Sequence, residues 1–135
     1  MALLTWSSKY SVGVPSMDSQ HTVLFNILNE LHDAMMNGHA HKLTGPLLDK
    51  LLSYTRTHFA AEEGILAAAG YPGLAEHRKI HRDLLDQVEI FNTKFKRGEG
   101  SINVQLLNFL RDWLTNHILK EDHGYSECVG ARHIR

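Results

Sequence analysis

Apolar residues recur at three- and four-residue steps through four long stretches of the chain, which is the pattern of amphipathic helices. These stretches cover residues 18–37, 44–69, 74–97 and 103–121. Glycine, proline and asparagine separate them, and strand signals are almost absent. Because the connections are short, consecutive helices should run antiparallel. The pattern therefore predicts an all-α, up-down-up-down four-helix bundle.

Two segments lie outside this pattern. Residues 1–17 form an N-terminal arm, and we expect its Trp6 and Tyr10 to cover one end of the bundle. Residues 122–135 have little periodicity and are predicted to form a short C-terminal tail. A chain of 135 residues is long enough to build one core of its own, so we assign residues 1–135 to a single domain.

Histidines occupy positions on the apolar faces of all four predicted helices. Two pairs, His58 with Glu62 and His77 with His81, have members four residues apart. Four residues advance ~400° around a helix, so both members of a pair project from one face. Isolated His21 and His117 lie on the other two helices. Each buried polar group without a partner would cost ~1–3 kcal/mol, and a shared metal ion removes that cost. The constellation therefore predicts a metal site inside the bundle.

A second carboxylate lies near the end of the fourth predicted helix, and spacing leaves its identity open. Glu121 follows His117 by four residues and would share its face. Asp122 follows by five, which is ~140° around a helix, and would reach the site only where the helix end frays. Geometry alone does not choose between them.

The ligand count predicts two metal ions. Five imidazoles and two carboxylates exceed the needs of a single six-coordinate ion. If both carboxylates bridge, a metal with three histidines has five protein ligands, and its neighbour with two histidines has four. One bridging oxide or hydroxide raises these to six and five, which leaves one position open on the two-histidine metal. Nitrogen and carboxylate donors favour iron, manganese or cobalt over structural zinc. The excess of neutral imidazole favours reversible chemistry over oxygen cleavage.

Composition excludes other classes of protein. The net charge of −1 and the lack of a basic run argue against a nucleic-acid binder. No window approaches the ~18 apolar residues of a transmembrane segment, and the N-terminus lacks the apolar stretch of a secretory signal. The single cysteine, Cys128, fits a reducing compartment. We expect a cytoplasmic monomer.

The chain resembles the hemerythrin family. The pieces that carry the resemblance are Trp6, Val12-Gly13-Val14, Asp18-Ser19-Gln20-His21, His58-Phe59 followed by Glu62-Glu63, Tyr71-Pro72, His77 through His81, and His117-Ile118 followed by Asp122. All seven ligand positions match the family pattern in type and order. That pattern contains the five-residue step after the last histidine, which selects Asp122 over Glu121.

The resemblance implies a non-haem di-iron centre with an oxo or hydroxo bridge. The two irons would be held by His77, His81 and His117 on one side and by His21 and His58 on the other, with Glu62 and Asp122 bridging. Dioxygen would bind reversibly at the two-histidine iron, for oxygen transport, storage or delivery to an oxygen-consuming enzyme. The protein itself would not be an enzyme. The alternatives are an oxygen or redox sensor and a di-iron enzyme acting on peroxide or nitric oxide.

Apolar residues beside the ligands are candidates for an oxygen pocket, namely Leu24, Phe59, Leu114 and Ile118. A dry pocket would hinder proton access and so slow oxidation of the site. We expect Leu114, three residues before His117, to gate ligand access; the alternative is that these residues only pack the core. No ligand role is expected for the remaining histidines, which are His32, His39, His41, His123 and His133.

Overall fold

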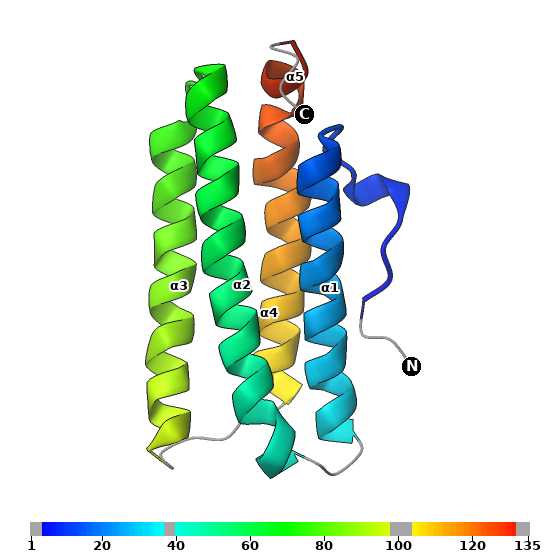
Figure 1. The fold of residues 1–135 in the computed structure, drawn as a ribbon, viewed down its shortest axis with the longest axis vertical. Coiled ribbons are helices and arrows are strands. Elements are labelled where there is room, and N and C mark those ends of the chain that lie inside the picture. Colours follow the sequence, from blue (N-terminus) through cyan, green and yellow to red (C-terminus); the bar gives the residue numbers. More distant parts are fainter. Residues whose placement is uncertain (1–3, 37–39, 98–103, 132–135) are drawn as a thin grey trace.

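The computed structural model describes residues 4–36, 40–97 and 104–131, and four long helices lie side by side in it (Figure 1). They are α1 (Pro15–Met36), α2 (Ala40–Ala69), α3 (Leu74–Lys96) and α4 (Val104–His117). A short 3-10 helix, η1 (Ser8–Tyr10), precedes them, and α4 continues through a π-helix, η2 (Ile118–Asp122), into α5 (His123–Ala131). The predicted all-α four-helix bundle is confirmed.

Several helix boundaries differ from those expected. α1 begins at Pro15, because proline suits the first turn of a helix. α2 begins at Ala40, so Pro46 lies inside the helix and not in its first turn. Residues 37–39 and 98–103, which hold two of the expected breaks, lie outside the described part of the chain. Within that part, no helix is long and apolar enough to cross a bilayer.

The prediction of an irregular tail is wrong for residues 123–131, which form α5 (Figure 1). Tyr125 and Val129 lie four residues apart on α5, and both are fully buried. Two positions are too few to establish a period in the sequence, although they extend the apolar face of α4. α5 therefore covers the end of the bundle and belongs to its core.

The arm packs along the flank of α1, not over the end of the bundle as expected (Figure 1). Trp6 and Tyr10 contact Phe25 with ring centroids 5.4 and 5.0 Å apart. Asn29 fixes the start of the arm, because its side chain both donates to and accepts from the backbone of Leu4. These contacts hold the arm against the middle of α1.

The arm and α5 are joined where the chain turns into α1. Asp18 accepts hydrogen bonds from the Ser11 hydroxyl and the Val12 backbone N–H, and the Ser126 hydroxyl donates to the Val12 carbonyl. Gly13 has a φ of +73°, a left-handed conformation that glycine adopts without strain. A Cβ atom there would lie 3.4 Å from the Ser126 hydroxyl oxygen. The space there would admit a Cβ in ordinary contact, so it is the positive φ that favours glycine at this turn.

Candidate metal centre

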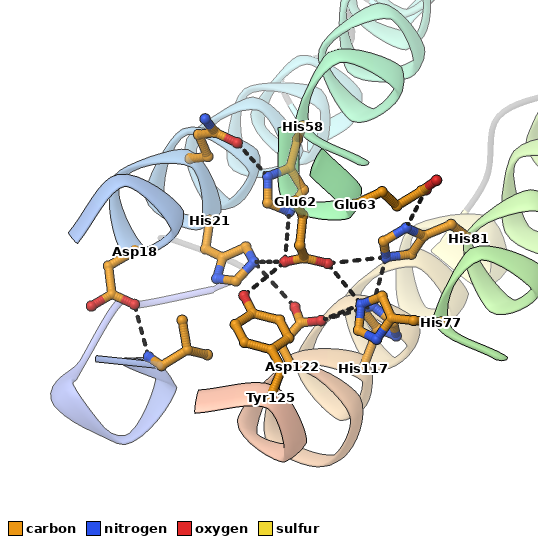
Figure 2. A network of polar contacts seen from close by, with 12 residues as sticks. Asp18, His21, His58, Glu62, Glu63, His77, His81, His117, Asp122 and Tyr125 are labelled. Atoms are coloured by element: carbon orange, nitrogen blue, oxygen red, sulfur yellow. Dashed lines mark hydrogen bonds and ion pairs between the residues drawn. The ribbon is translucent and has the colours of Figure 1, made fainter. Parts of the chain in front are cut away.

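Seven side chains from five elements converge in the half of the bundle nearest α5 (Figure 2). All of them are buried, with at most 6% of any residue exposed. They are His21 from α1, His58 and Glu62 from α2, His77 and His81 from α3, His117 from α4 and Asp122 from η2. The structure thus brings together every residue that the sequence singled out as a ligand.

Three histidines and one oxygen from each carboxylate form the first group of donor atoms. Glu62 Oε1 lies 2.8 Å from His77 Nε2 and 3.1 Å from His81 Nε2. Asp122 Oδ1 lies 3.1 Å from the Nε2 atoms of both His77 and His117. The Nε2 atoms of His81 and His117 are also 3.1 Å apart. Adjacent corners of an octahedron with bonds of ~2.1 Å are about 3.0 Å apart, so this spacing suits ligands of one ion.

The other oxygens of the same carboxylates face the remaining two histidines. Glu62 Oε2 lies 3.5 Å from His21 Nε2 and 3.6 Å from His58 Nε2. Asp122 Oδ2 lies 3.1 Å from His21 Nε2. Each carboxylate therefore presents one oxygen to each histidine group, which is the arrangement of a bridging ligand between two ions.

Unsatisfied polar atoms provide a test of whether a metal fits this site. Both carboxylate oxygens of Asp122 and both ring nitrogens of His21 are buried without a hydrogen-bond partner. Asp122 and His21 are nevertheless 3.1 Å apart, so they touch without the alignment of a hydrogen bond. Each orphaned group costs ~1–3 kcal/mol. Cations bound there would take lone pairs from both Asp122 oxygens and from His21 Nε2, so the residues present fit a two-metal centre.

The π-helix explains how Asp122, five residues after His117, reaches the same site. The His123 N–H donates to the Ile118 carbonyl, five residues back, in place of the usual four. A π-turn adds one residue to the hydrogen-bonded ring of an α-helix, so a step of five residues brings Asp122 back toward the face of His117. Asp122 is fully buried whereas Glu121 is half-exposed. The expectation that Asp122 reaches the site at a fraying helix end is wrong, because helix continues beyond it.

Before metal binds, the site is a network of opposite charges. Burial by itself lowers the pKa of His21, but the carboxylates of Asp122 and Glu62 outweigh it and raise the pKa to about 9. The same balance raises the pKa of His77 to about 9. At His58 burial prevails and lowers the pKa to about 4. Burial opposes ionisation of both carboxylates, but the neighbouring histidines hold their pKa values below the usual range.

Tyr125 is a site residue that the sequence reasoning missed. Its hydroxyl donates to Glu62 Oε2 over 2.9 Å, from α5 to the two-histidine side of the site (Figure 2). Burial, together with the charges of Glu62 and Asp122, raises the pKa of Tyr125 far above its usual value. The phenol therefore keeps its proton and acts as a hydrogen-bond donor. Its one signal in the sequence is its position three residues after Asp122, the spacing of one helical face.

Two of the ligand histidines have outer partners on their Nδ1 atoms. His81 Nδ1 lies 2.9 Å from Glu63 Oε2, and His58 Nδ1 lies 2.7 Å from Gln20 Oε1. Glu63 therefore lies outside the ligand set, behind His81 (Figure 2). Gln20 was missed as a site residue, although it directly precedes His21.

An apolar cavity of about 40 Å³ adjoins the site. Leu24, Phe59 and Leu114 line it, whereas Ile118 is fully buried and is not among its lining residues. The only lining side chains with a polar atom are Thr55 and Trp113. The other residues that line it are Leu28, Leu51, Leu52, Leu84, Leu85, Val88 and Leu110. A cavity lined in this way favours small apolar molecules over water.

Two aromatic side chains connect this cavity to the three-histidine group. Phe59 stacks on His81 with a centroid distance of 3.6 Å and an interplanar angle of 2°. Trp113 stacks on His117 at 4.5 Å and 15°. Phe59 therefore packs a ligand as well as lining the cavity.

Two histidines outside the set can be placed. His32 is half-buried on α1, and His123 is exposed at the start of α5. Neither belongs to a metal-ligating group among the described residues. His39 and His133, and the side chain of His41, fall outside the described part of the chain.

The fold and the site together define a four-helix-bundle protein with a candidate two-metal centre. The family model of the hemerythrin HHE cation binding domain matches residues 12–129. The bacteriohemerythrin of Methylococcus capsulatus is 36% identical over 132 residues, which are 97% of this chain and 100% of that protein. The bacteriohemerythrin of Stenotrophomonas maltophilia is 35% identical over 131 residues, covering 97% of this chain and 84% of that protein.

A solved structure of wild-type hemerythrin superposes with a TM-score of 0.90 at 36% identity, covering 95% of this chain and 98% of that chain. The chain belongs to the hemerythrin family. This membership supports dioxygen binding at a di-iron centre as its function.

Proposed function

We propose that this protein binds dioxygen reversibly at two iron ions held by the seven converging side chains. The observation that carries the proposal is the position of the carboxylates, each with one oxygen toward three histidines and the other toward two. One iron would be held by His77, His81 and His117 and the other by His21 and His58, with Glu62 and Asp122 shared. When bound, two ferrous ions would supply the electrons for reversible binding of dioxygen.

The protein's own residues would keep the site unsaturated on one side. The two-histidine group offers four donor atoms from the protein, against five in the other group, so its ion has more room for an added ligand. Leu24 and Leu114 line the adjoining cavity. Dioxygen is small and apolar and so suits this cavity, whereas ions and water are disfavoured there.

The lining of the cavity also favours reversible binding of oxygen over catalytic turnover. The Thr55 hydroxyl already donates to the Leu51 carbonyl. No carboxylate, lysine or histidine is among the lining residues. An enzyme that cleaves peroxide or reduces nitric oxide needs a proton donor at the reacting ligand. The cavity offers no such acid, which favours a carrier or store of oxygen.

The wider physiological role rests on this proposal. Delivery to an oxygen-consuming enzyme, a cytoplasmic location and a monomeric state stay predictions. Co-purification with such an enzyme, and a change in its activity on addition of the loaded protein, would support delivery. Light scattering in solution would check the monomer.

The test is a cycle of oxygen addition and removal, started from the reduced protein without air. The protein is loaded with iron, reduced, exposed to oxygen and then depleted of oxygen, while its optical spectrum is followed. An oxygen-dependent absorption that appears and disappears over repeated cycles is expected. One-way oxidation would contradict reversible binding and favour redox sensing or catalysis, and a stoichiometry other than two irons per chain would contradict the site itself.

A further inference from the structure

The outer partners of the two histidine groups differ in charge. Glu63 is an anionic carboxylate beside His81, which belongs to the three-histidine group, and Gln20 is a neutral amide beside His58, in the two-histidine group. The Nε2 atoms of both rings face Glu62, so their Nδ1 atoms carry the proton and donate it outward. Both partners fix the same tautomer, and only one of them adds negative charge.

A carboxylate changes a ligand histidine more than an amide does. A hydrogen bond donated to an anion draws the proton away from the ring and makes the opposite nitrogen a stronger electron donor. A stronger donor, with a negative charge nearby, stabilises the more oxidised state of the metal that the ring binds. Glu63 therefore acts on the three-histidine metal, and Gln20 leaves the two-histidine metal without that effect.

We propose that this pair of outer partners polarises the centre, so that the three-histidine iron is the more easily oxidised and the two-histidine iron, which has the open position, stays ferrous more readily. The inference rests on the proposed di-iron function and makes Glu63 and Gln20 positioning residues. Such a bias keeps the ion that receives dioxygen in the state that can bind it.

Arg78 connects Glu63 to the surface. Its Nε lies 3.3 Å from Glu63 Oε1, and the two side chains are 50% and 24% exposed. The guanidinium offsets part of the carboxylate's charge, and solvent screens this offset. Removing Arg78 should therefore strengthen the influence of Glu63 slightly, in the direction opposite to removing the Glu63 charge.

A purely structural role for Glu63 makes a different prediction. If Glu63 only orients the His81 ring, glutamine, which has nearly the same shape and can accept the same hydrogen bond, should replace it without a change in redox behaviour. Glu63→Gln and Gln20→Glu therefore separate charge from geometry. The double variant E63Q/Q20E keeps the net charge of the chain and exchanges the two partners.

The experiment measures iron content, midpoint potentials and the electron paramagnetic resonance spectrum of the one-electron-oxidised form, prepared with a chemical oxidant. Variants are E63Q, Q20E, R78Q and the double variant, beside the parent chain. We expect E63Q to disfavour oxidation about tenfold, a rise of ~59 mV for one electron. Q20E should lower the potential, and R78Q should lower it by less. The double variant should change the resonance spectrum, because the ferric ion moves to the other histidine group.

Retention of Zn²⁺ against a chelator gives a readout that is independent of redox chemistry. E63Q should release zinc more readily, since outer partners of metal-binding histidines contribute about 10–100-fold to affinity. Unchanged potentials and an unchanged spectrum in both E63Q and Q20E, with two irons bound, would overturn the inference and leave the di-iron function intact. Failure of the parent chain to hold two irons would overturn the proposed function and this inference with it.

Discussion

Replacing Tyr125 by phenylalanine tests whether the phenol supports Glu62. The hydrogen bond from Tyr125 to Glu62 Oε2 is 2.9 Å long, and neither residue is exposed. A hydrogen bond to a charged group contributes ~1.5–3 kcal/mol. Phenylalanine keeps the ring and its packing, so this bond accounts for nearly all of the expected loss. We expect the metal-free protein to lose about 2 kcal/mol in free energy of unfolding.

Urea denaturation of the metal-free protein measures this loss. With a slope of ~2 kcal/mol per molar urea, a 2 kcal/mol loss lowers the midpoint by about 1 M. Tyr71→Phe is the matched control, because Tyr71 packs edge-on against Tyr125 with centroids 6.4 Å apart and is half-exposed. A loss below ~0.5 kcal/mol in Y125F, or an equal loss in Y71F, would refute the reasoning.

Four further predictions concern the site. Leu114→Ala enlarges the apolar cavity beside His117 and should speed oxidation of the reduced, oxygen-loaded protein several-fold; unchanged oxidation and oxygen kinetics would show that Leu114 only packs the core. Because the pKa values of His21 and His77 are about 9 in the metal-free protein, loading with metal at pH 7.5 should release about two protons, measurable by calorimetry in buffers of different ionisation enthalpy. The raised pKa values of His21 and His77 also stabilise the folded, metal-free protein. This stabilisation is fully present below the ordinary histidine pKa of 6.5 and is lost as pH rises through about 9. The urea midpoint of the metal-free protein should therefore fall over that range, and a flat profile would contradict this prediction. Deleting exposed Leu119 from the π-helix should leave an ordinary α-helix with His117 and Asp122 four residues apart and two metals still bound, whereas deleting exposed Asp112 from α4 should lower the metal content.

The sequence predicted the bundle and the ligand set from one source, the regular period of an α-helix. The pairs His58 with Glu62 and His77 with His81 could be read because each lies within an unbroken helix. Where that period changes, the same reasoning gave the wrong expectation for the helix. The step from His117 to Asp122 looked wrong for a helix, since periodicity carries no sign of a π-turn, and only the family resemblance chose the aspartate.

Two other errors have a similar origin. Tyr125 was missed because, among the α5 residues whose burial is described, two are fully buried, too few for a pattern to emerge. Ile118 was placed at the oxygen pocket because it follows His117, but adjacent residues on a helix point ~100° apart. It is fully buried in the core and is not among the residues that line the cavity. Contacts made through outer partners, such as that of Gln20 with His58, depend on how helices are rotated against each other, which a single sequence does not specify.

The site is bounded by two different environments, and a reversible oxygen binder benefits from both. On one side the cavity beside Leu24 and Leu114 is almost wholly apolar, so a ligand there meets few proton donors. On the other side Tyr125 donates a single hydrogen bond to Glu62, and the raised pKa of the phenol keeps its proton in place. The arm is fixed to α5, since Val12 is only 1% exposed and is held by hydrogen bonds to both α1 and α5. Oxidation of the centre with loss of a reduced ligand requires protons, so under the proposed function the apolar wall and the fixed phenol would both help to keep bound dioxygen releasable.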